Sequence, residues 1–236
     1  MDIPQNFLNK LEDLLKIKNK SSDKYELEFR LYRVNSDDKR IFHISQDKFI
    51  NTIQRLTFDK TNGGFAMNYE VKHTLEITSD EDDIRLIVSG EDNIKKLWLH
   101  NSYDIQTSFI IKKRSEVIDL SEYNVRLALN EEETVEYDAL ESEKNVTNIM
   151  SNDAEKTFRY KKRYSVFPAS KDIRFDLTMT KMSVGADIVE SNVFKSITIY
   201  EIEMEYIGND GKSMDILKNL STLLMLVEDN NILLTT

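Results

Sequence analysis

The sequence has no cysteine, and only 6 glycines and 2 prolines occur among its 236 residues. Without cysteine the chain cannot form disulfides, zinc–thiolate sites, iron–sulfur clusters or a thiolate nucleophile, and a reducing compartment suits it. Glycine and proline together lie well below the roughly 12% of average usage, which excludes collagenous and low-complexity disordered chains. The three histidines, His43, His73 and His100, lie far apart in the sequence. Any metal site is therefore expected to consist of carboxylates, which favours hard cations such as Mg²⁺.

The sequence also lacks a long apolar run and an excess of basic residues. No stretch of about 18 apolar residues predicts a membrane span. The start, MDIPQNFLNK, lacks the basic and apolar regions of a secretory signal, so none is expected. With 32 basic and 42 acidic residues, the formal net charge is −10. Long nucleic-acid tracks usually need a basic surface, so this charge argues against such a track but not against a local anion pocket.

Hydrophobic periodicity predicts four amphipathic helices and eight strands, most of them long. The helices are expected at residues 3–17, 45–58, 91–100 and 213–228. The strands are expected at residues 24–34, 68–78, 83–89, 106–118, 123–134, 156–167, 171–182 and 194–207. Asn62-Gly63-Gly64 is expected to form a turn, the acidic stretch Glu131–Glu143 a solvated connection, and Trp98 the anchor of its helix.

This order of elements predicts an α+β fold. Long alternating strands with few helices are typical of a closed antiparallel eight-stranded β barrel, or a strongly curved sheet, with helices packed outside. Closed barrels often run to 200–250 residues as one domain. No composition shift marks a boundary, so residues 1–236 are expected to form a single domain.

Charged residues gather on single faces of several predicted strands, because side chains at i, i+2 and i+4 share a face. For any one strand, the simpler interpretation is the solvated face of an antiparallel sheet. The patterned faces are Glu26-x-Glu28-x-Arg30, Arg126-x-Ala128-x-Asn130-x-Glu132, Arg159-x-Lys161-x-Arg163, Arg174-x-Asp176-x-Thr178 and Glu201-x-Glu203-x-Glu205.

Taken together, these faces favour a polar tunnel. Three like charges spaced roughly 6.5–7 Å apart on one strand repel one another unless opposite charges lie between them. If the sheet closes with these faces inward, acidic strands can lie near basic ones, and the apolar faces pack against the helices. Burying so many charges is costly unless they pair or bind ions. Such a tunnel predicts carboxylates that hold a divalent metal and bases that hold a polyanion such as a triphosphate.

The ordered motifs resemble the triphosphate tunnel metalloenzymes, specifically the metal-dependent RNA triphosphatases of fungal and large-DNA-virus mRNA capping. Arg85 in IRLIVSG and the Lys112-x-Arg114 region complete the set between Glu26 and Glu205. The composition, rich in Asn, Lys and Ile, resembles that of the N-terminal domain of a giant-virus, mimivirus-like capping enzyme. The resemblance implies removal of the γ-phosphate from the 5′-triphosphate end of RNA, which leaves a diphosphate end, with Mg²⁺ or Mn²⁺ as cofactor.

The same resemblance implies partners and a location. Nucleoside triphosphates would be further substrates, and guanylyltransferase and methyltransferase domains would follow in a longer, multifunctional chain. No membrane partner is implied. The expected location is intracellular and reducing, in the virion or in a viral factory of the host cytoplasm.

The resemblance also implies roles for individual residues. The metal ligands would be Glu26, Glu28 and Glu205. Glu132 would orient the attacking water, with Glu131 and Glu133 as neighbouring alternatives. The bases that hold phosphate would be Arg85, Lys112, Arg159, Lys161 and Arg163. Lys113 is an alternative to Lys112, because a shift of one residue changes the strand face. The residues that orient their neighbours by ion pairs would be Arg174, Asp176, Glu201 and Glu203.

Two other functions remain open at this point. A triphosphatase of the adenylyl cyclase–thiamine triphosphatase branch would act on ATP, thiamine triphosphate or inorganic polyphosphate, but that branch usually has lysine where Arg30 stands. A non-catalytic β domain would bind partner proteins through a charged face, and Glu28 and Glu205 would then face bulk solvent on opposite sides. A P-loop NTPase has no GxxxxGK[ST] sequence to support it.

Overall fold

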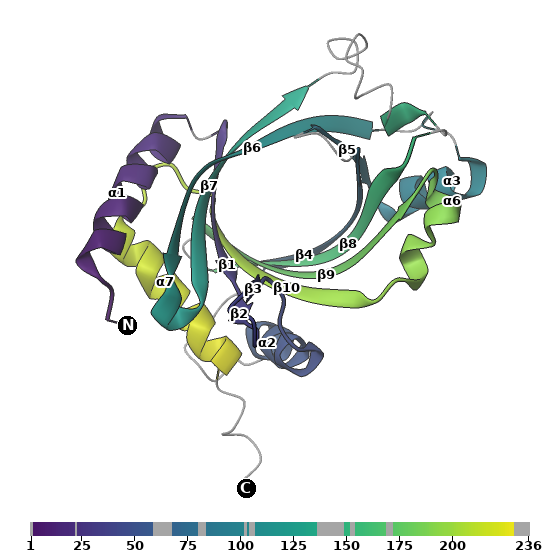
Figure 1. Ribbon diagram of the computed structural model, residues 1–236. Helices are drawn as coiled ribbons and strands as arrows, with labels where there is room; N and C mark the ends of the chain where they lie inside the picture. Colours follow the sequence, from purple (N-terminus) through teal and green to yellow (C-terminus); the bar gives the residue numbers. More distant parts are fainter. Residues whose placement is uncertain are drawn as a thin grey trace, which may run out of the picture.

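Eight antiparallel strands close into a barrel, in the order β1-β10-β9-β8-β4-β5-β6-β7. The computed structural model describes residues 2–21, 23–58, 68–79, 84–101, 103, 107–135, 149–151, 154–168 and 172–228. Figure 1 shows the strands as a ring with the helices on its outside. The closed eight-stranded antiparallel barrel predicted from the sequence is therefore confirmed.

The elements largely follow the predicted ranges. The barrel strands are β1 (Tyr25–Leu31), β4 (Asn68–Thr78), β5 (Ile84–Ser89), β6 (Thr107–Leu120), β7 (Val125–Val135), β8 (Lys156–Phe167), β9 (Ile173–Gly185) and β10 (Thr198–Tyr206). The described α-helices are α1 (Gln5–Lys20), α2 (Gln46–Phe58), α3 (Glu91–His100), α6 (Ile188–Ser191) and α7 (Ser213–Glu228). None of the described helices has the length and apolar character needed to cross a membrane.

The hydrophobic core lies outside the barrel, between its outer face and the helices. Leu27 and Phe29 of β1 point outward and are 0% exposed, in the same cluster as Phe7 and Leu11 of α1. A second cluster joins α3 to β4 and β5. The predicted apolar face of α7 is buried in full: Ile216, Leu217, Leu220, Leu223, Leu224 and Val227. Because the outward faces supply the core, the inward faces are free to be polar.

Two predicted strands have different ends in the structure. The strand predicted at 24–34 stops at Leu31, and a separate hairpin forms from β2 (Arg33–Val34) and β3 (Arg40–Ile41). Between them the Tyr32 amide donates to the Asn124 carbonyl, and its side chain is buried, so the chain leaves the barrel there. The strand predicted at 194–207 begins only at Thr198, because Val193–Lys195 form a 3₁₀ turn.

Two other predictions are wrong in part. The stretch Glu131–Val135 is not a connection but the end of β7, paired with β6. Trp98 is 44% exposed and does not anchor α3, whose buried residues are Ile94 and Leu97. The predicted turn at residues 62–64 and the rest of the acidic stretch lie outside the described residues.

Strand β6 contains a bulge. Arg114 pairs with Asn130, but Glu116 pairs with Leu129, so Ser115 is an extra residue in β6. A bulge of this kind shifts the alternation of side chains by one position. Residues before and after Ser115 therefore follow different parity along the same strand.

Replacing Phe29 by alanine should destabilise the protein. This ring is fully buried against the outer helices, and emptying such a site costs about 3–5 kcal/mol of unfolding free energy. Urea denaturation measures the change. Ile197→Ala is the control, because this side chain is 87% exposed and should change stability by less than about 0.5 kcal/mol. Equal losses for the two variants would contradict a core on the outer face.

Candidate active site inside the barrel

The strand register turns the charged motifs toward the inside of the barrel. Glu28 lies directly opposite Glu205 in the β1–β10 pair, and Arg30 lies opposite Glu203. On the other edge of β1, Glu26 lies opposite Asn130 of β7. Directly paired residues share a face of the sheet. The polar faces of β7, β1 and β10 therefore meet along one side of the lumen.

Two adjoining cavities occupy this lumen. The wide compartment has a volume of about 340 Å³, and the narrow compartment has a volume of about 80 Å³. Both are lined by Glu26, Arg85, Lys112, Lys161 and Arg163. The wide compartment is further lined by Glu132, Arg174 and Glu205, and the narrow one by Glu28, Arg30, Arg159, Glu201 and Glu203.

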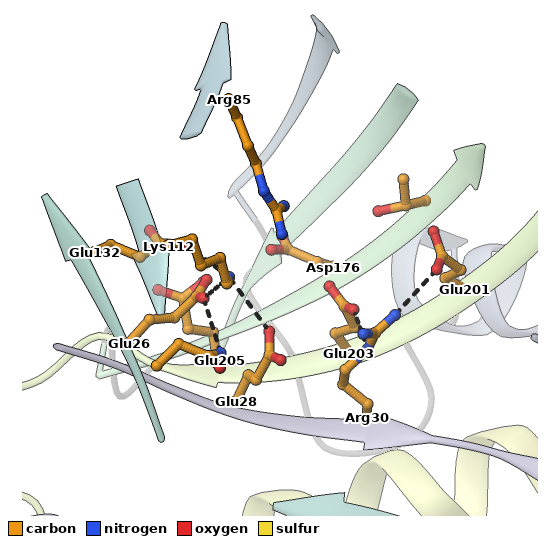
Figure 2. Close-up of polar contacts among 12 residues, drawn as sticks. Glu26, Glu28, Arg30, Arg85, Lys112, Glu132, Asp176, Glu201, Glu203 and Glu205 are labelled. Carbon is orange, nitrogen blue, oxygen red and sulfur yellow. Dashed lines mark hydrogen bonds and ion pairs between the residues drawn. The ribbon is translucent and has the colours of Figure 1, made fainter. Parts of the chain in front are cut away.

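The Lys112 ammonium lies among the carboxylates of one part of the lumen (Figure 2). It donates to Glu26, lies 2.6 Å from Glu132 Oε1 and is 4.0 Å from Glu28 Oε2. Burial works against its charge, but Glu26 and Glu28 raise the pKa of Lys112 above its usual range. Burial likewise opposes ionisation of Glu26, yet Lys112 lowers the pKa of that carboxyl to about 2. These two groups therefore form a stable charged pair.

Glu28 and Glu205 are not neutralised in this way. Burial, together with the charges of Glu203 and Glu26, raises the pKa of Glu28 to about 7. Burial and the charge of Glu26 raise the pKa of Glu205 to about 8, although Arg174 donates to it. The nearby bases therefore offset only part of the cost of ionising these two carboxyls.

The basic strand β8 lines both compartments. Lys161 is buried between Arg159 and Arg163 on β8, and burial together with these like charges lowers its pKa despite its bond to Glu76. The Arg159 Nε is buried and makes no hydrogen bond to the residues that the structure describes. This arrangement concentrates positive charge and leaves a donor available for an anion.

Glu76 of β4 holds these bases together, and the sequence analysis missed it. Its carboxylate accepts from Lys161 and lies 3.6 Å from Arg85 Nη1 and 3.9 Å from Arg159 Nη1. Burial alone would raise its pKa, but Lys161 and Arg159 lower it to about 2. The available signal was the alternation of Thr74 and Glu76 with buried apolar residues in the predicted strand 68–78.

The other predicted residues form ion pairs in and behind the cavity walls. Asp176 is 2% exposed and accepts from Arg174 Nε at 3.0 Å and from Ser165 Oγ at 2.6 Å. Its Oδ2 is 3.5 Å from Arg163 Nη1. On β1, Arg30 bridges two carboxylates of the acidic strand β10. Its Nη2 is 3.0 Å from Glu201 Oε1, and its Nε is 2.7 Å from Glu203 Oε1.

The structure also shows which of the alternative residues reach the lumen. Lys112 lines both compartments, whereas Lys113 is exposed. Glu132 lines the wide compartment, whereas Glu131 pairs with Lys24 at 2.8 Å on the outside. Of the predicted site residues, Asp176 alone lies behind the cavity walls rather than on them. Within the described ranges, no three acidic or histidine side chains already converge as metal ligands.

Glu28 and Glu205 also test the binding-domain alternative. That interpretation required the two carboxylates to face bulk solvent on opposite sides of the molecule. Instead they are register partners inside a closed barrel. A solvated charged sheet is therefore not favoured.

A closed barrel with a charged lumen is the architecture of the triphosphate-tunnel class. The solved structure of the RNA triphosphatase domain of a trifunctional mimivirus mRNA capping enzyme matches with a TM-score of 0.66 and 16% identity, over 97% of this chain and 100% of that one. A second structure of the mimivirus capping enzyme triphosphatase matches with a TM-score of 0.67 and 16% identity, over 96% and 99%. The S. pombe Pct1 RNA triphosphatase matches with a TM-score of 0.64 and 13% identity, over 97% and 95%.

Comparisons of sequence alone add nothing to this similarity: no protein-family model and no curated protein matches the chain. At 13–16% identity the similarity to the solved structures concerns the fold. The chain therefore shares the tunnel barrel with these proteins over nearly its entire length.

Protonation of Glu76 should lower the free energy of unfolding at acidic pH. Its pKa of about 2 in the folded protein lies below the roughly 4.3 of an unfolded glutamate. Its stabilising effect is therefore complete above about pH 4.3, is lost as the pH falls toward about 2, and amounts to at most about 3 kcal/mol. Urea unfolding across this window should show a shallower pH dependence for Glu76→Gln than for the wild type.

The control for this measurement is Glu116→Gln, which changes an exposed glutamate paired with Lys10 on the surface. Its pH dependence should follow the wild-type curve. Parallel curves for the wild type and Glu76→Gln would contradict the buried ionised state of Glu76.

Proposed function

We propose that this chain is a divalent-metal-dependent polynucleotide 5′-phosphatase that removes the γ-phosphate from 5′-triphosphate RNA, the first step of mRNA capping. One observation carries the proposal: carboxylates of β1 and β10 and the clustered bases of β8 line the same two adjoining compartments of the lumen. A triphosphate would supply negative charge to the clustered bases, and its metal ion would supply positive charge to the carboxylates. The fold shared with proteins described as RNA triphosphatases supports the same substrate.

The acidic residues fit a metal ion. Burial and neighbouring carboxylates raise the pKa of Glu28 and of Glu205, so a cation bound at these residues would favour their ionised forms. Carboxylate oxygens are the ligands that Mg²⁺ and Mn²⁺ prefer. We propose that Glu26, Glu28 and Glu205 hold this ion. When bound, it neutralises negative charge on the γ-phosphate and polarises the phosphorus–oxygen bonds.

The basic residues would bind the phosphate oxygens. Phosphoryl transfer through a loose transition state depends on positioning and charge neutralisation more than on covalent help. Donors that are already in place stabilise the developing charge without reorganisation. Arg159, Lys161 and Arg163 are held by Glu76 and Asp176, and the unpartnered Arg159 Nε can donate to a phosphate oxygen. Arg85 lines both compartments and would bind the same group.

Glu132 would orient the attacking water. It lines the wide compartment opposite Lys112 in the β6–β7 pair, and its carboxylate can accept a hydrogen bond from water. The water oxygen forms a bond to the γ-phosphorus while the bond to the bridging oxygen breaks, which leaves a diphosphate end and inorganic phosphate. Lys112 touches both Glu26 and Glu132, so it can link the ligand set to the bound phosphates.

The first test is phosphate release from γ-labelled, triphosphate-ended RNA with Mg²⁺, Mn²⁺ or EDTA. We expect metal-dependent release, and a loss of more than about a hundredfold in Glu28→Ala, because this variant removes a ligand and no core volume. Thermal unfolding of the variant checks that it is folded. Wild-type activity in Glu28→Ala would refute the metal assignment.

ATP, tripolyphosphate and thiamine triphosphate serve as parallel substrates in this assay. Release from these compounds without release from RNA would refute the RNA substrate and favour the alternative branch of the tunnel fold. No phosphate release from RNA or from any of these compounds would refute the proposal that the chain is a triphosphatase.

Arg163→Ala should lower kcat/KM by roughly a hundredfold, because it removes a preorganised cation from the phosphate site. Lys162→Ala is the matched control on the same strand. Its ammonium lies on the outer face, 5.5 Å from the Tyr164 ring, so kcat/KM should stay within about twofold. Equal effects of the two variants would move the phosphate site away from the lumen.

We also propose that the chain acts as one domain of a longer capping enzyme with guanylyltransferase and methyltransferase domains. The support is the mimivirus neighbour, which matches over its full length and is described as a domain of a trifunctional enzyme. Such an enzyme would act where viral transcripts are made, in the virion or in a factory in the host cytoplasm. A stop codon directly after Thr236 in the native gene would contradict this proposal.

A further inference from the structure

Two isoleucines interrupt the charged lining of the wide compartment. Ile87 of β5 and Ile110 of β6 both line it. Ile110 pairs with Arg85, and Ile87 pairs with Ser108, so the two isoleucines are diagonal neighbours on one face. Such neighbours lie about 7–8 Å apart, within reach of each other's side chains. Together they form one apolar step on the tunnel wall, which we call the isoleucine step.

The isoleucine step does not belong to the core of the protein. The outward residues Leu86 and Val88 of β5 are fully buried under α3 and fill that role. Ile87 and Ile110 are only partly buried and stand outside both core clusters. An apolar side chain that faces a polar lumen gains little from folding, since the stabilisation follows the apolar area removed from water. The step therefore has more to gain from a ligand than from the fold.

The isoleucine step lines only one of the two compartments, so their linings differ in chemical character. The narrow compartment is lined by charged residues and Thr178 alone and contains neither isoleucine. The wide compartment, about four times larger at about 340 Å³ against about 80 Å³, contains both. Phosphate groups suit the narrow compartment, whereas a nucleoside, with its flat base and the C–H groups of its ribose, suits the wide one.

We infer that the isoleucine step receives the first nucleoside of the substrate, whose triphosphate then extends along the bases that line both compartments. This inference rests on the proposed function and names a specificity-determining surface for it. Lys72 and Thr74 of β4 line the same compartment. They offer a cation for the following phosphodiester and a hydroxyl for the ribose. The step distinguishes a triphosphate attached to a nucleoside from free tripolyphosphate, which has nothing to place against it.

The test is the double variant Ile87→Thr/Ile110→Thr. Threonine keeps the β-branched shape that suits a strand and removes the apolar surface. The measured quantity is kcat/KM for triphosphate-ended RNA, for ATP and for tripolyphosphate. The value should fall about tenfold for RNA and ATP, as expected when a pocket loses apolar contact, and change less than about twofold for tripolyphosphate.

Val71→Thr is the matched control, because this side chain is 40% exposed and points away from the lumen on the adjacent strand. It should leave all three values unchanged. An equal fall for all three substrates in the double variant would overturn the inference, as would no change at all.

A binding measurement separates this inference from the proposed function. Calorimetry gives the Kd of the wild type and the double variant for ATP and for tripolyphosphate, whether or not either is hydrolysed. If the wild type hydrolyses nothing, the proposed function fails on its own. A selective loss of ATP affinity in the double variant still supports the isoleucine step, and an unchanged ratio of the two Kd values overturns it.

Discussion

The direct pairing of Glu28 with Glu205 is the interaction on which the interior of this barrel depends. Two strands that carry acidic residues on one face are hydrogen-bonded neighbours, so Glu28 and Glu205 face the same lumen from directly paired positions. Nearby bases neutralise part of this negative charge. Lys112 pairs with Glu26, Arg174 pairs with Glu205, and Arg30 pairs with Glu203 of β10. Burial, together with the neighbouring carboxylates that remain, raises the pKa of Glu28 and of Glu205. Each strand around the lumen is constrained by the same requirement for compensating charge.

The outward face of each strand contributes to the stability of the fold, and the inward face carries the residues of the candidate site. Outward residues such as Phe29 and Phe175 are packed beneath the helices and contribute apolar burial. Inward residues contribute little to that core, so natural or engineered changes there alter charge and shape without emptying it. Asp176 and Glu76 are the exceptions, because each is a buried carboxylate that several bases share. Their loss would leave like charges unopposed in a low-dielectric environment, which is costly.

Strands in which apolar and charged residues alternate regularly could be predicted from the sequence. Lumen residues on strands without such regular alternation could not. Leu27 and Phe29 alternate with Glu26 and Glu28 so regularly that the strand and its two faces could be predicted. Glu76 was missed because it shares its face with a lysine and a threonine, so no repeated sign marks it. Ile87 of the isoleucine step could not be singled out, because the segment IRLIVS of β5 carries apolar residues on both faces. The adjacency of β8 and β4 joins segments distant in the chain, and no local pattern encodes such a pairing.

The bulge at Ser115 has a consequence for how β6 tolerates change in length. Lys112 pairs with Glu132 and Asp119 pairs with Arg126, two residues on the same face of β7. An odd number of positions separates Lys112 from Asp119, so a regular strand would place them on opposite faces. The one extra residue lets a single strand supply Lys112 to the carboxylates and Asp119 to Arg126, which it binds at 2.9 Å. Deletion of Ser115 would make this separation even, so a regular strand would keep Lys112 and Asp119 on the same face and lose only the bulge.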